Sequence, residues 1–238
     1  MSLTYATYVS SLANLMVVPS SDANFLTDLP NIIDYAELRM YRDLDLIDTS
    51  ARDSSATFTA GNRNFSYPTA SGSFIVTDEL NVITPVGTNN AELGTRVPLI
   101  PTSEEMLNSL WPNSNGSGTP QYFAMMNQDL AIVGPWPNSA FNVEVVGTIR
   151  PTTLSANNTT TVLTQFFPDM FLAASMVRAA GYQKNYGQGI DDPKMAITWE
   201  SVFQTLLTSA KTEESRKKFE GPGWSSKDPS QTATPPRT

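Results

Sequence analysis

The sequence predicts an α+β fold: a four-helix bundle formed by an N-terminal and a C-terminal helix pair, with an inserted β-rich, sandwich-like domain and an extended C-terminal tail. Two observations predict this class. Apolar residues recur with helical spacing before about residue 53 and after about residue 160, whereas the residues between them alternate in polarity. Pro, Asn and Thr are also frequent in this middle region, as in strands joined by turns. We expect residues 1–52 and 159–219 to form the bundle, residues 53–158 the insertion and residues 220–238 the tail.

The first helix is expected over about residues 4–17. Its apolar residues fall on one stripe at helical spacing, and Pro19 ends it. Ser21 or Asp22 then offers a cap for a short turn.

The second helix is expected to start at Pro30, because the first helical position does not need the N–H that proline lacks. Arg39 and Asp43, four residues apart on a more polar face, are expected to pair weakly. The apolar stripe of this helix consists of Ile33, Ala36, Met40, Leu44 and Ile47.

The middle region predicts short strands and one short helix. Phe58 and the Phe65/Tyr67 pair flank the turn-rich residues 61–64, which indicates a β-hairpin. Residues 102–105 (TSEE) match a capping box, so a short helix is expected to follow them. The other strand candidates are residues 73–76, 80–83, 96–100, 122–126, 130–133 and 141–149.

Two more helices are expected near the C-terminus. The third spans about residues 168–185, and the fourth begins with Asp192 as its cap and Pro193 as its first residue. Trp199 and Phe203 of the fourth helix are expected in the core. The apolar stripe of this helix consists of Met195, Trp199, Val202, Phe203, Leu206, Leu207 and Ala210.

The composition argues against an enzyme. The chain has no His and no Cys, which removes the usual proton shuttle, thiol nucleophiles and the commonest metal ligands. We therefore expect no catalytic residue, no cofactor and no metal site. Asp43, Asp45 and Asp48 lie close enough in sequence for a Ca²⁺ or Mg²⁺ site, but a solvated helix end is the favoured interpretation.

Charge is distributed unevenly along the chain. Residues 1–210 hold 9 Lys or Arg and 19 Asp or Glu, a net charge of −10, whereas residues 211–238 carry +2. An acidic body holds nucleic acid poorly and suits a surface along which DNA slides without sticking. No apolar stretch approaches the roughly 18 residues of a membrane span, and the N-terminus lacks the pattern of a signal peptide.

The tail carries the candidate binding residues. Residues 220–238 contain several Gly and Pro and too few apolar residues to fold alone. Trp224 is either part of a dangling tail or an anchor that fills a pocket on a partner, and the basic run before it favours the anchor. The candidate partner-binding residues are Arg216, Lys217, Lys218, Phe219, Trp224 and Lys227.

Several motifs occur in a specific order and spacing. They are residues 31–46 (NIIDYAELRMYRDLDL), residues 118–124 (GTPQYFA) followed by residues 130–136 and 142–149, and residues 167–174 (FPDMFLAA) followed by Ala179, Ala180, Tyr182 and Trp199. Together, over roughly residues 5–220, these motifs resemble the head-to-tail adaptor proteins of short-tailed bacteriophages.

The resemblance implies a structural virion protein without catalytic activity. It implies a closed homo-oligomeric ring, expected to be a dodecamer, that joins the portal vertex of the capsid to the tail nozzle. C-terminal segments would dock under the portal protein, and duplex DNA would pass through the channel without specific binding. Such a protein is made in the host cytoplasm and resides in the neck of the virion, without contact with a membrane. The alternative, suggested by the polar β-rich region, is a host- or glycan-binding virion protein.

Overall fold

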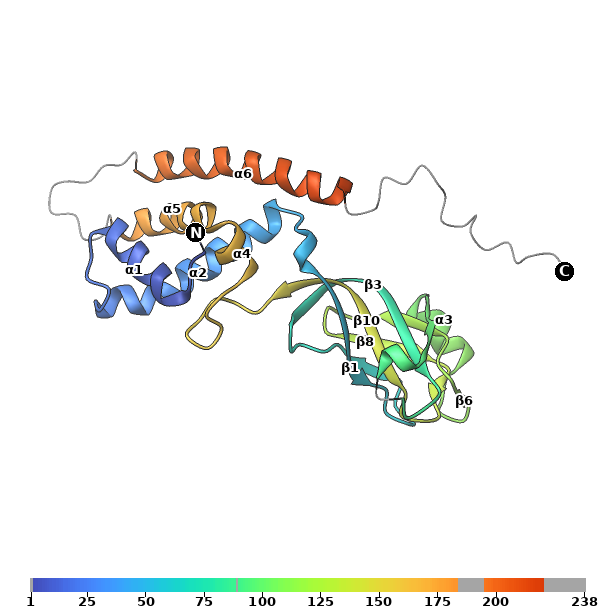
Figure 1. The fold of residues 1–238 in the computed structure, drawn as a ribbon. Helices are drawn as coiled ribbons and strands as arrows, with labels where there is room; N and C mark the ends of the chain where they lie inside the picture. The colour runs from blue at the N-terminus through green and yellow to red at the C-terminus, as the bar shows by residue number, and fades with distance from the viewer. Residues whose placement is uncertain (1, 89, 184–194, 221–238) are drawn as a thin grey trace. The chain divides into compact units, whose positions relative to one another are not determined.

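The computed structural model describes residues 2–88, 90–183 and 195–220 (Figure 1). Within these ranges the fold is mixed α+β, as the sequence predicts. The chain divides into two compact units. Residues 1–47 together with residues 163–238 form the helical unit, and residues 48–162 form the β unit.

The helical unit is organised around its third long helix, α5. The helices are α1 (Tyr5–Met16), α2 (Ala23–Asp43), α4 (Val162–Phe166), which begins at the unit boundary, α5 (Pro168–Gln183) and α6 (Met195–Glu220). α5 packs against α1, α2 and α6, and Figure 1 shows it between α6 on one side and the α1–α2 pair on the other. None of the helices in the described ranges is long and apolar enough to cross a membrane.

α1 confirms the prediction for residues 4–17. The side chain of Thr4 accepts a hydrogen bond from the backbone N–H of Thr7 at 3.3 Å, and the side chain of Thr7 accepts one from the N–H of Thr4 at 2.8 Å. This reciprocal pair is a capping box. Val17, with φ of 56°, ends the helix in the left-handed conformation.

α2 begins earlier than the sequence predicts. Asp22 caps it, with Oδ1 accepting the N–H of Phe25 at 2.8 Å. The predicted start at Pro30 is therefore wrong, because Pro30 lies inside the helix. A proline in a helix interior costs about 3 kcal/mol, but the turns before Pro30 bury Phe25 and Leu29 almost completely, and this burial offsets the cost.

α2 also ends earlier than its apolar stripe suggests. Leu44 is the C-cap and has an extended backbone. Ile47 lies in the 3₁₀ turn η1 (Ile47–Thr49), where its side chain is exposed. The helical part of the predicted stripe, Ile33, Ala36 and Met40, is buried as expected.

A buried polar contact lies in the core between α1 and α5. The rings of Tyr8 and Phe171 lie 4.9 Å apart, and the hydroxyl oxygen of Tyr8 is 2.7 Å from Oγ of Ser175. Burial raises the pKa of Tyr8 far above its ordinary value. This hydroxyl pair therefore remains neutral and joins the two helices within the core.

α6 places only part of its predicted stripe in the core. Phe203 is fully buried and Leu207 and Ala210 nearly so, whereas Trp199 is half-buried and Val202 is exposed. The prediction of a core position is thus confirmed for Phe203, whereas Trp199 is only partly buried. The predicted start of this helix, Asp192 and Pro193, lies outside the described residues.

The described residues of the β unit form three sheets. The first is antiparallel in the order β1 (Ser50–Thr57), β10 (Asn142–Pro151), β3 (Gly72–Thr84) and β4 (Thr95–Pro98). The second has the order β2 (Asn64–Ser66), β8 (Leu130–Gly134), β7 (Tyr122–Met125) and β5 (Ile100–Pro101), in which only β5 and β7 are parallel. The third pairs β6 (Ser117–Gly118) with β9 (Trp136–Pro137). The 3₁₀ turn η2 (Ala91–Leu93) precedes β4.

The first two sheets share one hydrophobic core. Its aromatic part is continuous, since the ring of Phe65 lies 5.1 Å from Phe58 and 5.4 Å from Tyr67. The buried members of this core are Phe58, Phe65, Tyr67, Phe74, Leu80, Val82, Leu99, Phe123, Ala131, Val133, Phe141, Val143, Val145 and Ile149. The predicted short helix is present as α3 (Glu104–Leu110), but the predicted capping box over residues 102–105 is wrong, because Ser103 caps the helix and accepts the N–H of Met106.

The predicted hairpin around residues 61–64 is wrong. β1, which ends before Phe58, pairs with β10 in the first sheet, and β2, which contains Phe65, pairs with β8 in the second. The turn-rich residues therefore carry the chain from one sheet to the other. Residues 73–76 and 80–83, expected as two strands, form the single strand β3.

The close approach of β10 and β3 depends on glycine. A Cβ atom added to Gly147 would lie 2.1 Å from the backbone carbonyl oxygen of Val76. Register irregularities occur in β10 on both sides of this position. Only a residue without a side chain fits between the two strands here.

Glu144, on the central strand β10, is a buried carboxylate. Its side chain is 1% exposed and accepts hydrogen bonds from Arg96, from Nε at 2.9 Å and from Nη2 at 3.0 Å. Nε of Arg52, on the neighbouring strand β1, lies 3.9 Å away. The bonds from Arg96 lower the pKa of Glu144 below its usual range, so the group is a charged link across the first sheet.

Candidate interaction surface

The C-terminal end of α6 is joined to the rest of the helical unit through a buried carboxylate. Glu214 is 3% exposed. Its Oε2 accepts the backbone N–H of Ile47 at 3.1 Å, and its Oε1 lies 2.8 Å from Nζ of Lys217. A buried carboxylate with two donors resists movement because separation would leave it unpaired. The last turns of α6 are therefore held in place.

Lys217 completes this attachment. Its ammonium also lies 3.1 Å from Glu213 and 5.5 and 5.4 Å from the ring centres of Phe166 and Phe167. The hydrogen bond to Glu214 is the main reason that the pKa of Lys217 is raised. Lys217 is therefore positively charged throughout the physiological range and is already engaged within the unit.

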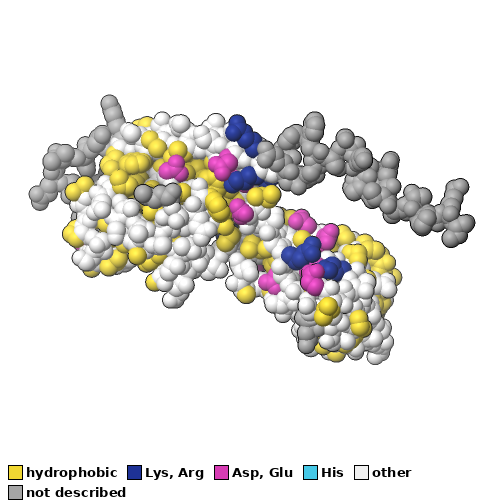
Figure 2. Space-filling view, viewed as in Figure 1, with side chains coloured by type: hydrophobic (Ala, Val, Ile, Leu, Met, Phe, Trp, Pro, Cys, Tyr) yellow, Lys and Arg dark blue, Asp and Glu magenta, His cyan; other side chains and the backbone are white. Residues whose placement is uncertain are grey.

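The structure brings three of the predicted binding residues together at the last turns of α6. Arg216 is exposed. Lys217 contacts Glu213 and Glu214, and Lys218 forms an ion pair with Asp45. The dark-blue side chains at this end of α6 are visible in Figure 2. The side chain of Phe219, and all of Trp224 and Lys227, lie outside the described residues.

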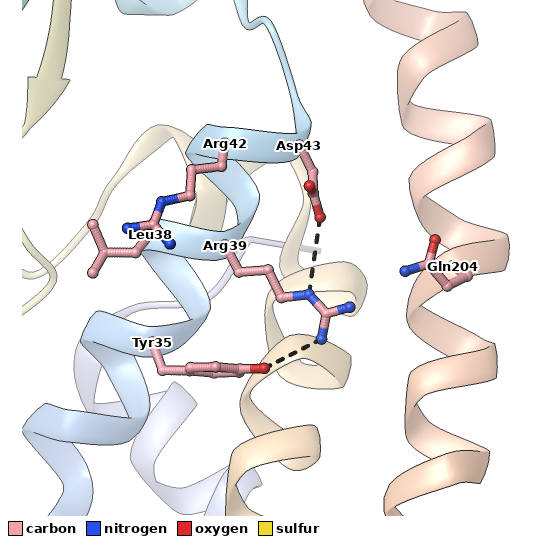
Figure 3. Close-up of a pocket in the computed structure, with 6 residues that line it drawn as sticks. All are labelled: Tyr35, Leu38, Arg39, Arg42, Asp43 and Gln204. Carbon is pink, nitrogen blue, oxygen red and sulfur yellow. Dashed lines mark hydrogen bonds and ion pairs between the residues drawn. The ribbon is translucent and has the colours of Figure 1, made fainter.

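A second feature of the helical unit is an open groove between α2 and α6 (Figure 3). Its volume is about 450 Å³. Figure 3 shows Arg39 extending from α2 towards α6, with Tyr35 and Asp43 on either side of its guanidinium. The groove is lined by Tyr35, Leu38, Arg39, Arg42, Asp43 and Gln204.

Arg39 joins α2 to α6. Its Nη1 and Nη2 donate to the two carboxylate oxygens of Glu200 at 2.7 and 2.5 Å, and its guanidinium lies 4.1 Å from the ring centre of Phe203. The bidentate bond raises the pKa of Arg39 and lowers that of Glu200. The predicted contact with Asp43 is present at 3.9 Å, but the dominant partner is Glu200, which sequence reasoning missed because it lies 161 residues away.

The three aspartates considered for a metal site do not converge. Asp43 lies near Arg39, and Asp45 pairs with Lys218. Across the part of the chain that the structure describes, no group of three or more Asp or Glu residues is placed to hold a metal ion.

The β unit has a polar groove of its own, beside two edge strands. β1 is the outer strand of the first sheet and β2 that of the second. The groove has a volume of about 630 Å³, and its one aromatic lining residue, Phe65, is 2% exposed. It is lined by Ser55, Ala56, Thr57, Thr59, Asn62, Asn64, Phe65, Ser66, Pro68, Thr69 and Ala70.

Comparison with known proteins agrees with this set of features. No curated protein matches the chain. A family model described as SU10 adaptor protein matches residues 3–223, which include the β unit, most of the helical unit and the whole of α6. The family is one of phage head–tail adaptors, structural proteins of the virion. The chain belongs to the SU10 adaptor protein family.

Proposed function

We propose that the chain is one subunit of a closed ring, expected to be a dodecamer, that joins the portal vertex of the capsid to the tail nozzle and forms part of the DNA channel. The match to an adaptor family over residues 3–223 is the observation that carries this proposal. An adaptor must present separate surfaces to its neighbours, and a chain with two compact units can do so.

We propose that the two units are separate structural parts of the adaptor. Residues 1–52 and 159–219 act as a four-helix bundle of α1, α2, α5 and α6, and residues 53–158 act as a sandwich of the first two sheets. The contacts of α5 with the other three helices and the core shared by the two sheets support these descriptions. The function needs no cofactor and no catalytic group.

The portal-binding site that we propose consists of the end of α6 and the residues after it. The members are Arg216, Lys217, Lys218, Phe219, Trp224 and Lys227. Because Lys217 and Lys218 are already paired within the helical unit, Arg216 and the aromatic residues should contribute most to binding. Burial of the Trp224 side chain would contribute on the order of 2–3 kcal/mol per subunit, and repetition around a ring turns weak contacts into strong attachment.

The acidic body suits the proposed channel. Residues 1–210 carry a net charge of −10. A negatively charged channel wall does not retain the phosphate backbone of DNA. The isolated protein should therefore not bind duplex DNA tightly. Salt-sensitive, tight binding in a filter or mobility-shift assay would contradict the channel.

The decisive experiment mixes the full chain with the portal protein of the same phage and images the product by negative-stain electron microscopy. We expect a ring of subunits added to the portal. A variant that lacks residues 221–238 should keep its melting temperature within about 1 °C, because a segment of this composition has too few apolar residues to build a core, and should fail to attach. Attachment of the truncated variant at the wild-type yield would refute the proposed portal-binding site.

The second candidate is a host- or glycan-binding virion protein, which the polar groove of the β unit favours. Its hydroxyl and amide groups suit a carbohydrate, but its one aromatic lining residue is buried. A glycan array separates the candidates. Specific glycan binding without addition to the portal would favour the second candidate over the adaptor.

A further inference from the structure

α6 presents an uncharged outer face. From Ile197 to Ser209 every exposed position is uncharged, and Ile197 itself is 70% exposed. The charged group within this stretch, Glu200, is bound to Arg39 of α2. Figure 2 agrees, since mostly white and yellow atoms cover this helix except near its C-terminal end. The exposed positions are Ile197, Thr198, Ser201, Val202, Gln204, Thr205, Thr208 and Ser209.

Two threonine hydroxyls of this face bond to the helix backbone. Oγ1 of Thr205 donates to the carbonyl of Ser201, and Oγ1 of Thr208 donates to that of Gln204, both at 3.0 Å. Thr212 continues the pattern one turn later. A threonine bound in this way needs no water for its proton, so a neighbour that covers the face meets methyl groups and loses few hydrogen bonds.

α1 has a face of the same kind. Residues 1–21 contain no charged side chain. The hydroxyls of Thr7 and Ser10 donate to backbone carbonyls of their own segment at 3.0 Å. At the end of the helix, Leu15 is 38% and Val17 is 88% exposed. The described surface of α1 is therefore uncharged, as is the exposed surface of α6 from Ile197 to Ser209.

The two faces lie on opposite sides of the same unit. Within the helical unit α5 packs against both α1 and α6, and Figure 1 shows these two helices on opposite sides of α5. Two different complementary surfaces on opposite sides of one subunit give head-to-tail contacts, which close into a ring when the rotation between copies is suitable.

We propose that the α1 face of one copy packs against the α6 face of a second copy of this chain. The inference rests on the proposed ring and names the contact that builds it. The occupant that we propose is another copy, although each copy carries a net charge of −8. Identical acidic bodies repel each other unless they meet through uncharged surfaces, and both helices supply such a surface. Small side chains such as Ala6, Ser10 and Ser201 also allow close helix packing.

The size of the contact predicts when it forms. A helix of 12 residues is about 18 Å long and about 10 Å wide, so the contact covers a few hundred Å² per copy. This is below the roughly 800 Å² per partner of a stable interface. The isolated protein should therefore be mainly monomeric at micromolar concentration, and the contact should form when the portal holds neighbouring copies side by side.

Disulfide cross-linking tests the contact directly, because the chain has no Cys of its own. The double variant Ser10→Cys with Thr205→Cys, assembled on the portal protein and oxidised, should give a ladder of covalently linked copies. Each single variant should remain monomeric on a denaturing gel. The control pair is Ser10→Cys with Ser114→Cys, in which Ser114 is an exposed loop residue of the β unit, and it should give no ladder.

Charge insertion gives an independent readout. Thr205→Glu with Thr208→Glu should lower the yield of rings on the portal at least tenfold, while circular dichroism and the melting temperature of the free protein stay near wild type. Ser114→Glu adds the same kind of charge elsewhere and should leave the yield unchanged. Rings that form without the Ser10–Thr205 ladder, or a dimer from either single cysteine variant, would overturn the contact while the adaptor role stands. Failure of the wild type to form rings would overturn the adaptor role itself.

Discussion

The bond between Arg39 and Glu200 should hold α6 against α2, and a double-mutant cycle can measure this. Arg39→Met keeps most of the apolar stem and removes the guanidinium, and Glu200→Gln keeps the shape and removes the charge. Exposed ion pairs contribute about 0.2–1 kcal/mol, and hydrogen bonds to buried charges about 1.5–3 kcal/mol. The side chains of Arg39 and Glu200 are 18% and 37% exposed. We therefore expect a coupling free energy of about 1–1.5 kcal/mol at pH 7 and low salt.

The coupling should depend on pH in a defined direction. Arg39 lowers the pKa of Glu200 in the folded protein, so the stabilisation is present above the pKa of the unfolded state, about 4.3, and is lost as the pH falls through the lower folded value. The coupling should thus be constant between pH 7 and about pH 5 and disappear in stronger acid.

Urea unfolding of the full chain, followed by circular dichroism at pH 7 and at about pH 3, measures both effects. The matched control is Lys218 with Asp45, since Asp45 is 90% exposed. Its cycle should give a coupling close to zero. A coupling for Arg39 and Glu200 below about 0.3 kcal/mol at pH 7, or equal values at the two pH values, would refute the reasoning.

Three further predictions concern single positions. Glu144→Gln should lower the melting temperature of the β unit by several degrees at pH 7. The difference in melting temperature between the variant and the wild type should become smaller in acid. Arg96 lowers the pKa of Glu144 in the folded protein, so the wild type loses this stabilisation as the pH falls through the lowered pKa. Gly147→Ala should lower the free energy of unfolding in urea by about 2–3 kcal/mol, because its Cβ meets a backbone carbonyl oxygen. Gly118→Ala should change it little, because its Cβ would lie 3.4 Å from the nearest atom, Cγ of Pro135. Pro30→Ala should stabilise by about 1–3 kcal/mol in the same assay, since it restores a donor inside α2; an unchanged or lower midpoint would contradict this.

Local signals in the sequence were sufficient for much of the fold. The first helix over about residues 4–17, the start of α5 at Pro168 and the short helix near residues 102–105 depend on neighbouring residues, and each is found in the structure. The alternation around Val143 and Val145 likewise placed a strand correctly. Such features need only the bonding of a few adjacent backbone groups.

The errors occur where distant residues decide the outcome. Pro30 has a local preference for a helix start, which the burial of the preceding turns overrides. The turn-rich residues 61–64 suggest a hairpin, but the strands beside them find partners more than 60 residues away.

The candidate surface was only partly accessible to the same reasoning. The basic residues at the end of α6 could be read from the sequence, but their ion pairs with Glu214 and Asp45 could not. The uncharged face of α6 depends on which positions are exposed and on threonine hydroxyls that bond to the helix itself. Neither property can be read from the amino-acid composition or from the spacing of apolar residues along the chain.

The discontinuous helical unit has a consequence for biosynthesis. α1 and α2 leave the ribosome first, yet α5, the helix against which both pack, is made only after the whole β unit. The β unit is continuous in sequence and can therefore fold while α1 and α2 still expose the side chains of Tyr8, Phe25 and Ile32. The nascent chain thus carries two uncovered amphipathic helices for most of its synthesis, until α5 and α6 are made.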